Sequence, residues 1–119
     1  MCPGNNESAG KRKSGKTRKG DQWLRAALIE TAHACGRSRR TYLGALYGRL
    51  LRRRGKKKAA VAVGHAVLIS AYHVLDRHTE YTDMGADYFD RRDEHHLTRH
   101  LVHRLEGLGY SVQLERAAA

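Results

Sequence analysis

Apolar side chains recur at helical spacing along most of the chain, and this periodicity constrains the fold more than any other feature. It is clearest between residues 39 and 55, where the apolar positions are Leu43, Leu46, Tyr47, Leu50 and Leu51. The spacing i, i+3, i+4, i+7, i+8 places such side chains on one face of an α-helix. The sequence therefore predicts an all-α fold whose helices bury these faces against one another.

Three further stretches carry helical signals. Asp21 suits an N-cap for a helix over residues 22–35, and Gly36 suits its stop. A helix from about Lys57 is expected to be the most buried element, with a stripe formed by Val61, His65, Leu68, Ile69, Tyr72 and Leu75. A fourth helix is expected from Asp90, with an apolar face formed by Leu97, Leu101, Val102 and Leu105. About four helices are thus predicted.

Two segments between and after these helices lack helical periodicity. Residues 77–89 include Gly85 and are expected to form an ordered loop. Residues 110–115 alternate apolar and polar side chains as a strand does, but no second strand is expected to pair with them. We therefore expect a short C-terminal extended segment.

The first 20 residues differ in composition from the rest of the chain. They contain four glycines, six lysines and arginines and no apolar periodicity. Such a segment cannot bury a core, which predicts a poorly ordered basic arm. The expected organisation is a flexible arm over residues 1–20 and a single helical domain over residues 21–115.

Charge is segregated along the chain. Residues 1–58 hold 17 lysines and arginines against 3 aspartates and glutamates, whereas residues 59–119 hold 6 against 9. Such segregation is typical of a surface that binds a polyanion. We expect contacts with DNA or RNA phosphates from the cations Lys11, Arg12, Lys13, Lys16, Arg18, Lys19, Arg25, Arg52, Arg53, Arg54, Lys56, Lys57 and Lys58.

Several other function classes are disfavoured. No run of 18 apolar residues and no charged-then-apolar leader occurs, so neither a membrane partner nor secretion is expected. Cys2 and Cys35 lie far apart without a CxxC partner and are expected to be reduced thiols. These features predict a cytoplasmic, nucleoid-associated protein.

Histidines and aromatic residues admit competing interpretations. His96, His100 and His103 share one face of the fourth predicted helix, and a solvated face is favoured over a zinc site. His65 and His73 are expected to be partly buried, and Tyr47 and Tyr72 to be core residues. Trp23 either stacks on a base or packs under the arm. No metal site is predicted in this chain.

A serine in the arm is a candidate nucleophile. Ser8 precedes the small residues Ala9 and Gly10 and a dense cationic run. A serine that attacks a phosphodiester needs backbone freedom, positive charge to hold the phosphate, and help in losing its proton. Ser14 lies in a similar setting, so these requirements do not separate the two serines.

The motifs of the chain resemble those of a known family. They are Cys2-Pro3, Ser8-Ala9-Gly10, Lys19-Gly20, Leu24-Arg25, Thr41 to Leu50, Arg53 to Ala59, and Met84 to Asp93. In this order they are similar to the C-terminal transposase domain of the IS-one-ten type of insertion-sequence transposases, which are bridge-RNA-guided recombinases. The resemblance covers nearly the whole chain.

The resemblance implies a mechanism and a set of partners. It implies that Ser8 forms a covalent link to DNA, and that a separate RuvC-like domain supplies an acidic Mg²⁺ site. It also implies a homo-oligomer and a structured guide RNA that pairs with DNA. The RuvC-like domain and its coiled-coil link are absent from this sequence, so the chain is expected to be inactive alone. Two rivals are a non-catalytic nucleic-acid-binding remnant and a small ribosome- or nucleoid-associated protein.

Overall fold

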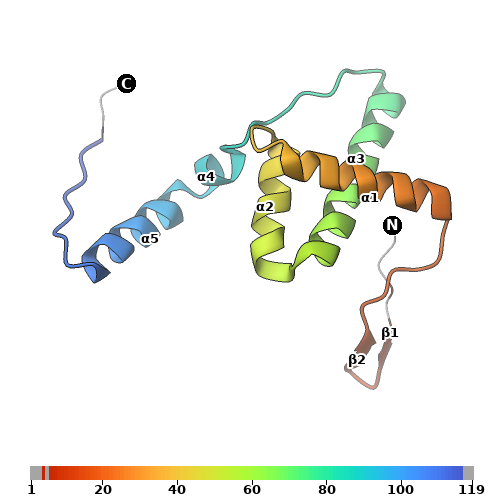
Figure 1. The fold of residues 1–119 in the computed structure, drawn as a ribbon, viewed down its shortest axis with the longest axis horizontal. Helices are drawn as coiled ribbons and strands as arrows, with labels where there is room; N and C mark the ends of the chain where they lie inside the picture. Colours follow the sequence, from red (N-terminus) through yellow and green to blue (C-terminus); the bar gives the residue numbers. More distant parts are fainter. Residues whose placement is uncertain (1–3, 5, 117–119) are drawn as a thin grey trace. The chain divides into compact units, whose positions relative to one another are not determined.

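The computed structural model describes residue 4 and residues 6–116, which fall into two compact units, Met1–Ala86 and Asp87–Ala119. The first unit contains β1 (Asn6–Ser8), β2 (Lys11–Ser14), α1 (Gln22–Arg37), α2 (Tyr42–Arg54) and α3 (Lys56–Arg77) (Figure 1). The second contains α4 (Tyr88–Arg92) and α5 (Glu94–Gly107). The predicted all-α fold class is confirmed. The boundary between the units falls inside the single helical domain that the sequence predicted for residues 21–115.

Polar side chains set the starts of the first two helices. The Asp21 carboxylate accepts a hydrogen bond from the Leu24 backbone N–H at 2.6 Å, which confirms the predicted N-cap of α1. At the start of α2, the Thr41 hydroxyl accepts one from the Gly44 N–H at 3.2 Å. Each cap satisfies a backbone donor that has no partner inside its helix.

The core of the first unit forms where α1, α2 and α3 meet. Its buried residues are Ala32, Tyr47, Ala59, Ala60 and Val63. Three of these five are alanines, so the helix backbones approach closely. Tyr47 is the largest of them, and its hydroxyl lies 3.0 Å from Nδ1 of His33. The prediction that Tyr47 is a core residue is therefore confirmed.

Gly44 permits the close approach of α2 to the end of α1. A Cβ atom on this residue would overlap the carbonyl oxygen of Ser38 and lie 2.9 Å from that of Cys35. Both obstacles are backbone atoms, which cannot rotate away. The tight turn between α1 and α2 therefore depends on glycine at this position.

The burial of α3 differs from its predicted stripe. The buried residues are Ala59, Ala60, Val63 and Gly64, all in its N-terminal half. Tyr72 and Leu75, predicted to be buried, are 62% and 73% exposed, and His65 and His73 are also exposed. These predictions were wrong because the residues of this 22-residue helix that are fully buried are small ones in its first half. By length and composition alone, α3 is also apolar enough to cross a membrane.

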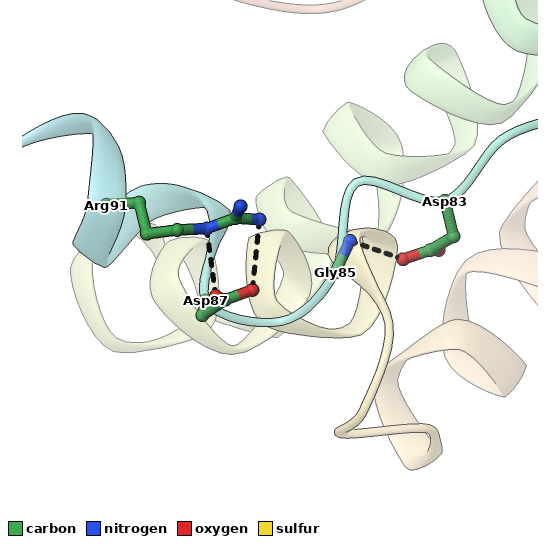
Figure 2. A network of polar contacts seen from close by, with 4 residues as sticks. All are labelled: Asp83, Gly85, Asp87 and Arg91. Atoms are coloured by element: carbon green, nitrogen blue, oxygen red, sulfur yellow. Dashed lines mark hydrogen bonds and ion pairs between the residues drawn. The ribbon is translucent and has the colours of Figure 1, made fainter. Parts of the chain in front are cut away.

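The segment after α3 is an ordered loop, as predicted, and Asp83 attaches it to α2. The Asp83 carboxylate accepts hydrogen bonds from the backbone N–H groups of Tyr42, at 3.0 Å, and Gly85, at 2.7 Å. Figure 2 shows the second of these contacts. Asp83 thereby joins this loop to the first turn of α2.

The second unit contains a helix that is interrupted at Asp93. One helix was expected from Asp90, but the structure has α4 and α5 with Asp93 between them at φ −135°. Asp87, before α4, pairs with Arg91 at 2.8 Å (Figure 2). Beyond α5 the chain is extended, as predicted, and Arg116 pairs with Glu94 at 3.3 Å. The extended segment therefore ends close to the start of α5.

Candidate nucleic-acid interface

The basic arm contains a short antiparallel hairpin, which the sequence did not predict. Strands β1 and β2 pair with Glu7 opposite Arg12 and Ser8 opposite Lys11, and an irregularity lies between Asn6 and Glu7. In Figure 1 the hairpin extends away from the three helices of its unit. Its residues are largely exposed. The arm thus presents its side chains on an ordered but unsupported projection.

The hairpin turns through two residues with left-handed backbone conformation. Ala9 has φ 52° and Gly10 has φ 72°, which is the pattern of a type I′ turn. Glycine adopts this conformation freely, but an L-residue such as Ala9 is disfavoured there by about 1–2 kcal/mol. Strain of this kind is concentrated at functional sites, and here it lies next to Ser8.

The structure separates the two candidate serines. The Ser14 hydroxyl accepts a hydrogen bond from the Lys16 backbone N–H at 3.2 Å, and its side chain is half-buried. Ser8 is exposed at the last position before the turn. Within the part of the chain that the structure describes, no hydrogen bond engages its hydroxyl. Ser8 is therefore the more accessible hydroxyl.

Strand alternation determines which neighbours share a face with Ser8. Opposed residues in an antiparallel pair project to the same side, with Cβ atoms about 4.5–5.5 Å apart. Lys11 is the partner of Ser8 and shares its face, whereas Lys13 lies at the register shift, where the alternation of faces is interrupted. Glu7 precedes Ser8 by one position and lies on the opposite face. The face that bears Ser8 is thus cationic.

The remaining cations of the arm extend toward α1. Lys16, Arg18 and Lys19 are exposed between β2 and the helix, and Arg25 is exposed in its second turn. Arg18, Lys19 and Arg25 line one cavity of about 240 Å³. Arg12 lies in β2, and its side chain lies outside the described part of the structure.

The second set of predicted phosphate contacts forms a corner between two helices. Arg52, Arg53 and Arg54 end α2, and Lys56, Lys57 and Lys58 begin α3 on the other side of Gly55. All six side chains are exposed. The arginines suit the negative end of the α2 dipole, but the lysines crowd the positive end of α3, which has no acidic residue in its first turn. A bound polyanion would relieve this repulsion.

Other predicted features do not join this interface. Trp23 is 86% exposed on α1 and does not pack under the arm. His96, His100 and His103 lie on α5, in the other unit. Among the described residues, no group of three or more histidines, cysteines, aspartates or glutamates is placed to hold a metal ion. Cys2 and Pro3 lie outside the described residues.

Two groups near the α1–α2 turn have shifted acidities. Burial raises the pKa of the Cys35 thiol, against a smaller opposing effect of a backbone hydrogen bond. Burial also raises the pKa of Tyr81, and the nearby Asp83 carboxylate adds to the shift. Both groups therefore stay neutral to higher pH than usual and are poorly suited to act as nucleophiles.

Sequence reasoning missed the hairpin because its strands contain almost no apolar side chains. The signal that was present is the dipeptide Ala9-Gly10 between two short polar runs, since glycine in a two-residue loop favours a hairpin. Without an apolar face on either side, that signal does not distinguish a hairpin from a flexible loop.

Comparison with known families gives one match. Residues 1–48 match the transposase IS116/IS110/IS902 family. The matched range includes the hairpin, α1 and the start of α2, whereas the motifs Arg53 to Ala59 and Met84 to Asp93 lie beyond it. Comparisons with curated proteins and with solved structures gave no match. Residues 1–48 are thus similar to the transposase IS116/IS110/IS902 family, and this match is to less than half of the 119-residue chain.

Proposed function

We propose that this chain acts in DNA strand exchange with Ser8 as the nucleophile that attacks a phosphodiester. The observation that carries the proposal is the position of Ser8. It is exposed at the end of β1, opposite Lys11, in the segment that matches the transposase family. A hydroxyl on a projecting hairpin can approach a phosphate of duplex DNA without obstruction from the helices.

The reaction would exchange one phosphate ester for another. The Ser8 Oγ forms a bond to phosphorus while the bond from phosphorus to one deoxyribose oxygen breaks. The serine proton is lost to a base or to solvent, and the leaving oxygen takes up a proton. The DNA strand is then held as a serine ester, which a second strand's hydroxyl can attack to restore a phosphodiester.

Lys11 would stabilise the charge that develops on the phosphate. It shares the Ser8 face as the cross-strand partner of Ser8, so its ammonium group can reach non-bridging oxygens of a phosphate at Ser8. Glu7 lies on the opposite face and is poorly placed to accept the serine proton. The proton acceptor is therefore expected to come from outside the hairpin.

The proposal includes a second domain and partners. A RuvC-like domain with an acidic Mg²⁺ site would act beside Ser8, and a guide RNA would select the DNA. The full assembly would be a homo-oligomer. On this account the chain alone binds nucleic acid but does not complete strand exchange.

A denaturing gel tests the assignment of the nucleophile. The chain is mixed with a RuvC-like domain of the same family, guide RNA, Mg²⁺ and end-labelled element DNA, and covalent protein–DNA species are scored. The parent and Ser14→Ala should form the species, and Ser8→Ala should not. Formation by Ser8→Ala at the parent level would refute the assignment.

A second candidate function is nucleic-acid binding without strand transfer. The six-cation corner between α2 and α3 favours it, because it can contact phosphates without any contribution from Ser8. In this case DNA would bind with a strong salt dependence, and the gel would show no covalent species even with the partner domain present.

A further inference from the structure

We infer that the cavity at the base of the arm binds a single unstacked nucleotide of the DNA strand that the arm contacts. The inference rests on the proposed function, because it takes the arm to contact DNA. The cavity would be a site that binds a base, whereas the cations around it would contact only phosphates.

The cavity lies where three parts of the chain meet. Its lining combines the segment from Thr17 to Asp21, the first turns of α1, and Leu68 of α3. The cavity has a volume of about 240 Å³, below the range of about 300–1,000 Å³ that is typical of sites for drug-sized ligands. The space therefore suits a small planar group such as one nucleobase.

The floor of the cavity is apolar. It is formed by Leu24, Leu28 and Leu68. Leu28 is only 8% exposed, whereas Leu24 is 49% exposed although it is a large aliphatic residue next to a highly charged arm. A flat ring that covers Leu24 would remove this apolar surface from water.

The rim of the cavity is cationic. Arg18, Lys19 and Arg25 are exposed around it, and none of them forms an ion pair with another described residue. The one acidic lining residue, Asp21, has its carboxylate engaged by the Leu24 backbone N–H at 2.6 Å. An apolar floor under a cationic rim matches the two ends of a nucleotide, a base and its phosphate.

The chain connects this cavity to the proposed nucleophile. Thr17 follows Lys11, the partner of Ser8, by six positions, so the rim lies within about 22 Å of Lys11 by chain reach. Bases along one strand of a duplex are about 3.4 Å apart. Because Ser8 lies about 5 Å farther, across the strand pair from Lys11, the bound nucleotide would lie within roughly eight positions of the attacked phosphate, on DNA that the same arm contacts.

Binding of two matched ligands tests the inference. Dissociation constants are measured for a 12-nucleotide single strand of DNA and for a 12-unit abasic strand with the same sugar–phosphate backbone. Leu24→Gln should weaken binding of the normal strand about fivefold, because the apolar surface that the base covers is lost, and should change binding of the abasic strand less than twofold. Leu75→Gln, the same change at an exposed leucine outside the cavity, should leave both constants unchanged. Arg25→Gln should weaken both ligands.

Two outcomes would overturn the inference. One is equal binding of the normal strand by Leu24→Gln and Leu75→Gln. The other is a loss for Leu24→Gln that is equally large on the abasic strand. The same measurement on an RNA strand of the same sequence gives a third comparison. If Leu24→Gln weakens binding of RNA but not of DNA, the cavity is assigned to RNA and the DNA assignment is refuted.

A measurement on the parent protein keeps the test independent of how the variants fold. DNA duplexes with 2-aminopurine at successive positions should show increased emission at one position on binding, because this base fluoresces more when unstacked. No increase at any position would overturn the inference. Loss of the Ser8 adduct would leave these results unchanged, so failure of the proposed nucleophile and failure of the nucleotide site are distinguishable.

Discussion

The Asp83 carboxylate accepts a hydrogen bond from the backbone N–H of Tyr42, at 3.0 Å and across 41 positions of sequence. Tyr42 begins α2, so a side chain from a distant loop satisfies a donor that lies at the positive end of a helix dipole. Asp83 also binds the N–H of Gly85. One carboxylate therefore holds together the first turn of α2 and the loop after α3.

Removal of this carboxylate should destabilise the first unit. Asp83→Ala is expected to lower the free energy of unfolding by about 1–2 kcal/mol, as for loss of a helix cap. Urea denaturation followed by circular dichroism measures the change. Glu80, an exposed acid in the same loop, supplies the control, because its side chain makes no hydrogen bond or ion pair with a described residue. Equal stability of Asp83→Ala and Glu80→Ala would contradict the role of Asp83.

Gly44 and Gly48 lie four residues apart on α2 and should respond oppositely to alanine. Gly44→Ala places a methyl group against the Ser38 carbonyl and should destabilise the unit by at least about 2 kcal/mol, since backbone must move. Nothing lies within 4 Å of a Cβ at Gly48, so Gly48→Ala should stabilise it by up to about 1 kcal/mol. Thermal unfolding of both variants checks this, and a stable Gly44→Ala would disprove the close approach of α1 and α2.

Alkylation should reveal the raised pKa of Cys35. With Cys2→Ser leaving one thiol, the rate of iodoacetamide modification should rise with pH through a midpoint above the ordinary value of 9.0. The raised pKa of Cys35 also makes the stability of the fold depend on pH. A thiol with a raised folded-state pKa stabilises the fold below the unfolded-state pKa, and this contribution is lost as pH rises through the folded-state pKa. A midpoint below 9.0 would contradict burial of the thiol.

Two lysines of the hairpin, Lys11 and Lys13, should determine part of the salt dependence of DNA binding. Each phosphate contact contributes about −0.9 to the slope of log K against log salt concentration. The double variant Lys11→Gln with Lys13→Gln should therefore flatten the slope by about 2. Arg92→Gln with Arg104→Gln removes the same charge from the second unit and should leave the slope unchanged. Equal slopes for the two double variants would remove the hairpin from the interface.

Sequence periodicity predicted the fold class because Leu43, Leu46 and Tyr47 repeat at helical spacing, and the N-cap at Asp21 was also predictable. It failed on α3, because aliphatic and aromatic side chains marked a stripe whereas the helices meet at Ala59, Ala60 and Val63. Small residues have weak hydrophobic signals, and the length of α1 and α2 decides which half of α3 they cover.

The candidate site was predictable in its residues and not in its geometry. The charge of the arm and the resemblance to a family singled out Ser8, but the pairing of Ser8 with Lys11 depends on a turn with positive φ at Ala9 and Gly10. The cavity at the base of the arm combines Arg18 with Leu68, 50 positions apart. Such a combination appears only in three dimensions.

The most direct test of the account is to identify the residue that carries the DNA. Trypsin cleaves after Lys11, and residues 1–11 contain Ser8 as their single hydroxyl-bearing side chain, whereas Ser14 falls in the separate peptide 14–16. The covalent species formed with the RuvC-like domain, guide RNA and Mg²⁺ is digested with nuclease and trypsin and analysed by mass spectrometry. The account predicts a nucleotide-bearing peptide 1–11. A nucleotide on peptide 14–16, or on any other peptide of the chain, would contradict it.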